Sequence, residues 1–220
     1  MIKFIAFDID GVIYDSSNFI EQAYSEAINI FCDQNPDLSL SKPRKSDIVF
    51  LIGKTYKEIV SSLFPYLADN YHENFRRILL EILDKKIRNL EGTLIENSIE
   101  VIKNLYNQNY ILGTASNGSA IYCNAVLQTY QIDRYFKEIQ YVDFVEFISK
   151  KDILAYYLKK YSFKPSELLM VGDRLVDLQA AKANNVYFCG IVGHGNLSEI
   201  ADSDFIINSI DFLPTILTTF

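Results

Sequence analysis

Residues 2–11 read Ile2-Lys3-Phe4-Ile5-Ala6-Phe7-Asp8-Ile9-Asp10-Gly11. The segment is β-branched and aromatic up to Phe7, carries one charge at Lys3, and then becomes acidic, which is typical of a buried strand that ends at Asp8. Similar apolar runs follow at 110–113, 168–171, 186–192 and 205–207, with a weaker one at 139–142. Continuous apolar strands of this kind occur in parallel sheets that are covered on both faces.

Apolar residues at helical spacing separate these runs, over residues 95–106, 153–161 and 175–183. Strands that alternate with amphipathic helices predict an α/β domain built on a parallel sheet. Residues 16–91 break the alternation, because they hold successive helical patterns without a strand between them. We therefore expect an all-helical module, residues 16–91, inserted in an α/β core made of residues 1–15 and 92–220.

The composition excludes some classes of function. The chain has 220 residues, of which 28 are acidic and 21 basic, so its net charge is −7. This balance argues against nucleic-acid binding, since a duplex binder needs a basic face to displace counterions. The charge at Asp8 interrupts the first apolar run and no later run reaches the length of a membrane span, so neither a signal peptide nor a membrane segment is expected. With three isolated cysteines, the chain is expected to be cytoplasmic, and its oligomeric state is left open.

Polar side chains stand at the ends of three predicted strands. Asp8 and Asp10 follow the first strand, Thr114 ends the second, and Asp173 and Asp177 follow a third. Because ligands of open parallel sheets bind beyond the carboxyl ends of the strands, we expect these side chains at one edge. Two like charges 4 Å apart repel by about 4 kcal/mol at an effective dielectric of 20, so the cluster requires a cation. Carboxylate oxygens suit Mg²⁺, which also takes ligands from a phosphate.

A second cation is expected from the adjacent pair Lys150 and Lys151, in the sequence Ser149-Lys-Lys-Asp152. The Ser-x-x-Asp pattern before an apolar helical stripe predicts the start of a helix. Lysine is unfavourable there by about 0.3–1 kcal/mol, because the helix dipole is positive at this end. An anion close by would explain the two lysines; the alternative is that both extend into solvent.

In their order and spacing these residues resemble the haloacid dehalogenase superfamily of phosphohydrolases. Four stretches are similar to that family's four motifs. In chain order they are Asp8-Ile-Asp10-Gly11, Thr114, Lys150 or Lys151, and Gly172-Asp173-Arg-Leu-Val-Asp177. The resemblance spans the whole chain. It implies a Rossmann-like parallel sheet with an α-helical cap after the first motif, most like the phosphoglycolate phosphatase and β-phosphoglucomutase branch.

The resemblance also implies roles for the acidic residues. Asp8 would be the nucleophile that forms an aspartyl-phosphate, and Asp10 would be the general acid and then the general base. Mg²⁺ would be bound by Asp8, the backbone carbonyl of Asp10, and Asp173. Asp177 would not bind the metal directly but would orient Lys150.

The phosphoryl oxygens would be held by Thr114, the backbone N–H of Ala115, and Lys150. Lys150 is preferred to Lys151 because it keeps the helical offset usual in the family. In the cap, Ile52-Gly-Lys54-Thr lies where the family's substrate-specificity segment is expected, so that Lys54 would bind a distal anionic group of the substrate. The alternative for Lys54 is a solvated helix N-terminus.

Together these features predict a Mg²⁺-dependent phosphatase that hydrolyses a small phosphorylated metabolite through an aspartyl-phosphate. Asp10 argues against the dehalogenase and phosphonatase members, which lack this second acid. A phosphosugar mutase is an alternative, disfavoured because such mutases carry a cap histidine where this chain has Phe19-Ile-Glu21. A non-enzymatic phospho-switch like a bacterial receiver domain is another alternative, but receivers have an adjacent acid pair and no helical insert. We interpret His72 and His194 as surface or turn residues.

Overall fold

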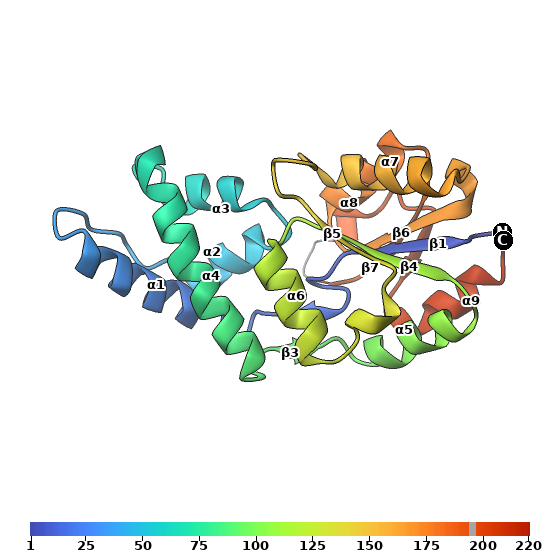
Figure 1. Ribbon diagram of the computed structural model, residues 1–220, viewed down its shortest axis with the longest axis horizontal. Coiled ribbons are helices and arrows are strands. Elements are labelled where there is room, and N and C mark those ends of the chain that lie inside the picture. Colours follow the sequence, from blue (N-terminus) through green and yellow to red (C-terminus); the bar gives the residue numbers. More distant parts are fainter. Residues whose placement is uncertain (194–196) are drawn as a thin grey trace.

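The computed structural model describes residues 1–193 and 197–220 (Figure 1). Within these residues, six strands form one parallel sheet in the order β5-β4-β1-β6-β7-β8. The strands are β1 (Phe4–Phe7), β4 (Ile111–Ser116), β5 (Glu138–Tyr141), β6 (Leu168–Gly172), β7 (Tyr187–Ile191) and β8 (Phe205–Ile207). The predicted α/β fold with a parallel sheet is confirmed.

The register of the sheet determines where the first acid lies. Phe7, the last residue of β1, pairs with Thr114 of β4 on one side and with Val171 of β6 on the other. The backbone N–H of Asp8 then donates a 2.9 Å hydrogen bond to the carbonyl of Val171. Asp8 is therefore held between the ends of two neighbouring strands, at the carboxyl edge of the sheet.

Helices cover both faces of this sheet, so its strands are apolar on both sides; every residue of β1 and β6 is buried. One face packs against α7 (Lys150–Tyr161) and α8 (Leu175–Ala183), and the other against α5 (Ser98–Asn107), α6 (Ala120–Thr129) and α9 (Leu213–Leu217). Short 3₁₀ helices occur at Asp69–Tyr71, Asp133–Tyr135, Pro165–Glu167, Leu197–Glu199 and Ile210–Phe212.

The four remaining helices of the described residues, which we call the cap, lie on the left in Figure 1, away from the two chain termini. They are α1 (Ile20–Gln34), α2 (Lys45–Leu51), α3 (Tyr56–Leu63) and α4 (His72–Arg88). The Phe75 ring meets Phe31 and Phe64 edge to face, with centroids 5.5 and 5.2 Å apart, in an apolar cluster that the cap helices share with α6. The expectation of helices throughout residues 16–91 agrees with this arrangement, while the domain boundaries at 16 and 91 stay a prediction.

Two short strands, β2 (Tyr14–Asp15) and β3 (Thr93–Leu94), pair antiparallel where the chain enters and leaves the cap. Strands of two residues are too short to show an alternation of apolar and polar residues, so they could not be predicted from the sequence. The cap also contacts the core through α4, which packs against α6. His72 begins α4 with its Nε2 3.0 Å from the carbonyl oxygen of Leu67, and it is only partly exposed. His194 lies outside the described residues.

No helix among the described residues combines the length and the apolar character needed to cross a membrane.

Candidate active site

The carboxyl edge of the sheet brings four charged side chains together. Asp8 follows β1, Asp173 follows β6, Asp177 lies in the first turn of α8, and Lys150 begins α7. Carboxylate oxygens of the three aspartates lie within 4.8 Å of one another. All four side chains are almost completely buried. The structure thus gathers four residues that the sequence placed in one site.

Lys150 is the cation of this cluster. Its Nζ lies 2.8 Å from Oδ2 of Asp8 and 2.6 Å from Oδ1 of Asp177. Burial lowers the pKa of the Lys150 ammonium, but the charges of Asp177 and Asp8 outweigh it, so the pKa is raised and the side chain stays charged. Lys151, the next residue, is exposed. Between the two lysines, the geometry therefore selects Lys150 for the site.

Three carboxylates and one ammonium of the described residues gather in this cluster. Burial raises the pKa of Asp177 to about 6, against the opposing charge of Lys150. Glycine lets the backbone approach the cluster closely: a Cβ at Gly11, where φ is +75°, would collide with the Asp173 carboxylate, and a Cβ at Gly193 would lie 2.8 Å from it. Three carboxylates that can each offer an oxygen atom fit a divalent metal ion.

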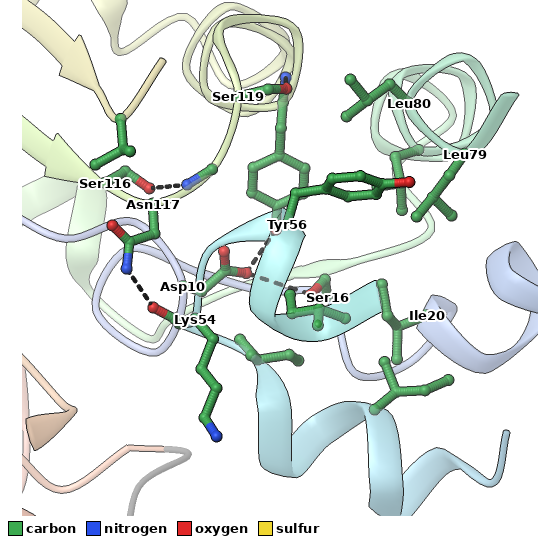
Figure 2. A pocket seen from close by; sticks show the side chains of 18 of the residues that line it. Asp10, Ser16, Ile20, Lys54, Tyr56, Leu79, Leu80, Ser116, Asn117 and Ser119 are labelled. Atoms are coloured by element: carbon green, nitrogen blue, oxygen red, sulfur yellow. Dashed lines mark hydrogen bonds between the residues drawn. The ribbon is translucent and has the colours of Figure 1, made fainter. Parts of the chain in front are cut away.

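Asp10 occupies a different environment from Asp8. Its Oδ1 accepts a 2.5 Å hydrogen bond from the hydroxyl of Tyr122 and a 3.3 Å bond from the hydroxyl of Ser16. Figure 2 shows Asp10 beside Ser16 in the cavity. Burial raises the pKa of Asp10 to about 7, and the charge of Asp8 raises it too, whereas the Tyr122 hydrogen bond lowers it. A carboxyl group with this pKa can both give and take a proton near neutral pH.

The structure places Thr114 differently from the prediction. Its hydroxyl donates a 2.9 Å hydrogen bond to the carbonyl of Gln140 in the neighbouring strand, and Thr114 does not line the cavity. Ala115 lies within β4, paired with Gln140. Two residues beyond Thr114, Ser116 ends β4 and lines the cavity, where its Oγ accepts a bond from the N–H of Gly118. Of the two hydroxyl groups of β4, the one that lines the cavity is therefore that of Ser116.

A cavity of about 110 Å³ separates the cap from this edge of the sheet. Asp8, Asp10 and Ser116 line it on the core side, and Lys54 and Arg76 are the basic residues that line it from the cap. The amine of Lys54 lies 5.5 Å from the centroid of the Phe50 ring. Figure 2 shows the Lys54 side chain extending away from Asp10. The predicted role of Lys54 as a ligand of a distal anion therefore needs a different side-chain conformation.

Two core side chains hold the cap segment 52–54 over the site. Asn117 Nδ2 donates a 2.7 Å bond to the carbonyl of Gly53, where φ is +90°. The guanidinium of Arg174 donates to the carbonyls of Ile52 and Phe50, the latter at 3.1 Å. Neither Asn117 nor Arg174 was predicted from the sequence. The signal for Arg174 is its position directly after Asp173, since a basic side chain there indicates that an acidic cluster or a carbonyl group lies close.

Comparison with known proteins agrees with this geometry. Residues 5–191 match the family model of haloacid dehalogenase-like hydrolases. The chain belongs to this family. A phosphoglycolate phosphatase from Vibrio vulnificus is 26% identical over 216 residues, which cover 95% of this chain and 93% of that protein. A glyceraldehyde 3-phosphate phosphatase from Methanothermobacter thermautotrophicus is 25% identical, with 96% and 94% covered.

Solved structures of haloacid dehalogenase-like proteins share the fold over the whole chain. A predicted phosphoglycolate phosphatase from Haemophilus somnus superimposes with a TM-score of 0.85 at 20% identity, covering 98% of both chains. CbbY from Rhodobacter sphaeroides, in complex with phosphate, gives 0.79 at 20% identity, covering 97% of this chain and 96% of that one. The predicted family, and the predicted enzyme class of a hydrolase of the phosphatase type, are confirmed.

Proposed function

We propose that the protein is a Mg²⁺-dependent phosphatase that hydrolyses a small phosphorylated metabolite through an aspartyl-phosphate on Asp8. The observation that carries the proposal is the cluster of Asp8, Asp173 and Asp177, in which Asp8 and Asp177 contact the Lys150 ammonium. A phosphate dianion 4 Å from the Asp8 carboxylate would be repelled by about 8 kcal/mol at an effective dielectric of 20. The attack is therefore possible only where cations neutralise both partners.

Two cations fit this requirement. Lys150 is already in contact with Asp8, and Asp177 holds its ammonium in place at 2.6 Å. Mg²⁺ would be held by Asp8, Asp173 and the backbone carbonyl of Asp10, and when bound it supplies the charge that neutralises the phosphoryl oxygens.

The chain's own residues divide the remaining work. A carboxylate oxygen of Asp8 forms a bond to phosphorus while the bond from phosphorus to the alcohol oxygen breaks, and protonated Asp10 gives its proton to that oxygen. Asp10, now ionised, takes a proton from water as the water attacks phosphorus and the bond to Asp8 breaks. Its pKa of about 7 suits both steps. Ser116, in place of Thr114, would donate to a phosphoryl oxygen.

The relatives support this class of substrate. Their names specify phosphoglycolate, glyceraldehyde 3-phosphate and pyrophosphate, all of them small phosphate esters or anhydrides. They do not agree on one leaving group, so the proposal names the reaction and the class of substrate.

Release of inorganic phosphate from a panel of phosphorylated metabolites, with and without Mg²⁺, tests the proposal. We expect turnover of at least one ester with Mg²⁺ and none after its removal by chelation. Asp8→Asn should abolish turnover, whereas Asp37→Asn, the same change at an exposed aspartate of the cap, should leave it unchanged. Full activity of Asp8→Asn, or of the metal-free protein, would overturn the proposal. Isomerisation of a sugar phosphate that exceeds phosphate release would instead identify a mutase.

A further inference from the structure

The cap contributes an aliphatic wall to the cavity. Side chains from all four cap helices form it: Ile20 of α1, Ile48 of α2, Ile59 of α3, and Leu79, Leu80 and Leu83 of α4. Figure 2 shows Leu79 and Leu80 across the cavity from Asn117. None of these six side chains can form a hydrogen bond or an ion pair. The part of the substrate that faces these six side chains meets carbon atoms.

Lys54, which also lines the cavity, has its amine 5.5 Å from the centroid of the Phe50 ring and extends away from Asp10 (Figure 2). Tyr56 and Arg76 have partners within the cap. The hydroxyl of Tyr56 donates a 2.7 Å bond to the carbonyl of His72. The guanidinium of Arg76 stacks 5.7 Å from the centroid of the Tyr56 ring and lies 3.6 Å from the carboxylate of Glu73, an exposed side chain. A second anion at Arg76 would have to compete with Glu73.

A carboxylate placed against such a wall loses its water without gaining partners, which is costly. An alkyl group placed there leaves water, which is favourable in proportion to its buried area. The cavity has a volume of about 110 Å³ and is open to solvent on one side, and for scale an apolar cavity of about 150 Å³ holds one benzene molecule. The space therefore suits a short branched chain or one small ring.

We propose that the preferred substrates are phosphate monoesters of small apolar alcohols, and that the aliphatic wall selects them against esters whose alcohol carries a carboxylate. The inference rests on the proposed phosphatase function, because it identifies the leaving group of the same reaction. It separates this protein from relatives that are named for phosphoglycolate, whose leaving group is an acid.

Isobutyl phosphate and 2-phosphoglycolate form a matched pair for the test. Their alcohols have the same number and connectivity of heavy atoms, because the two carboxylate oxygens of glycolate take the places of the two methyl groups of isobutanol. We expect kcat/KM to be at least tenfold higher for isobutyl phosphate in the presence of Mg²⁺. The affinities of Asp8→Asn for the two esters, measured by calorimetry with Mg²⁺ present, should differ in the same direction and do not depend on turnover.

A variant of the wall tests its part in the selection. Leu80→Asn replaces a partly buried side chain of the wall with a polar one of similar size, and it should reduce the preference for isobutyl phosphate severalfold. Ile30→Asn introduces the same chemistry at an exposed position of α1 that does not line the cavity, and should keep the wild-type preference. The readout is the ratio of kcat/KM for the two esters, measured on the same protein. A smaller fraction of folded protein lowers both values equally and does not change this ratio.

The outcomes separate this inference from the function on which it rests. A higher kcat/KM for 2-phosphoglycolate, or equal values for both esters, would overturn the inference and leave the phosphatase intact. Absence of turnover with every ester would overturn the proposed function, and the calorimetric preference would then decide the inference alone. An unchanged ratio in Leu80→Asn would show that the wall does not select the leaving group.

Discussion

The hydroxyl of Tyr122 lies 2.5 Å from Oδ1 of Asp10, although 112 positions separate the two residues in the sequence. Tyr122 is nearly buried on α6, the core helix that packs against α4 of the cap. The second donor to the same oxygen is Ser16, at the entrance to the cap. The carboxyl group proposed to carry the proton is thus fixed by one residue of the core and one residue of the cap connection.

Tyr122→Phe removes this hydrogen bond while keeping the ring, so we expect Asp10 to lose its orientation as general acid. General acid–base catalysis contributes about 10²–10⁴-fold to a rate, and partial loss of positioning should lower kcat about tenfold for an alkyl phosphate. p-Nitrophenyl phosphate should lose much less, because its leaving group departs without a proton. Tyr106→Phe, at an exposed tyrosine, is the control and should affect neither ester. Equal losses on both esters would argue against a positioning role.

Lys150→Met leaves Asp8 and Asp177 without the ammonium that contacts both. Removing one partner of a buried ion pair costs about 3–5 kcal/mol, so we expect the free energy of unfolding to fall by this amount and phosphate release to be lost. Lys151→Met makes the same change at the exposed neighbouring residue, and should alter stability by no more than about 0.5 kcal/mol. Urea unfolding measures both. Similar losses in the two variants would contradict the assignment of Lys150.

Substitutions at Ser116 and Thr114 should have opposite effects on activity: the first should lower kcat/KM and the second should leave it nearly unchanged. Ser116→Ala removes a hydroxyl at the cavity and should lower kcat/KM about tenfold, since a hydrogen bond to a charged group contributes about 1.5–3 kcal/mol. It also removes the acceptor of the Gly118 N–H, which should cost about 1 kcal/mol of stability. Thr114→Val removes the bond to the Gln140 carbonyl and should cost about 1 kcal/mol of stability, with kcat/KM nearly unchanged. If Thr114→Val instead abolished activity in a stable protein, the original prediction from the sequence would be correct.

The parallel sheet could be predicted from the sequence because its central strands are apolar on both faces, a pattern that few other structures produce. Asp8, Asp173 and Lys150 could be predicted because a buried charge needs a partner, so their residue types at strand and helix ends already indicate a shared site. The strand was predicted to end at Thr114, but β4 continues to Ser116 because Ser116 pairs with Tyr141 of β5. The sequence around Thr114 does not contain that information.

The roles of Tyr122 and Arg174 could not be predicted from the sequence, because they depend on partners more than a hundred positions away. A tyrosine in an apolar helix is as well suited to the core as to a site, and only the packing of α6 brings its hydroxyl to Asp10. The aliphatic wall was similarly hidden, since the same residues are expected in any helical core.

Glu138 should make stability depend on pH far from the active site. Burial raises the pKa of Glu138, but hydrogen bonds from Lys160 and Tyr161 outweigh it, and the pKa lies below its ordinary value of 4.5. A lowered pKa means that this carboxylate stabilises the folded state above pH 4.5 and that the stabilisation is lost as the pH falls through the folded-state value.

We therefore expect wild type to be more stable than Glu138→Gln near neutral pH, and the difference to shrink as the pH falls below 4.5. The midpoint of urea unfolding, measured across this range, checks the expectation. Glu96→Gln, at an exposed turn, serves as the control for loss of one negative charge. A difference that stays constant, or grows as the solution becomes more acidic, would show that the Lys160 and Tyr161 contacts do not act as described.

The most direct test of the whole account is the mass of the enzyme when the reaction is stopped by acid during turnover. With Mg²⁺ and a substrate ester present, the account predicts a phosphoryl group on the peptide that contains Asp8, and none on Asp8→Asn or without Mg²⁺. Steady release of phosphate by a protein whose Asp8 peptide never carries that group would contradict it.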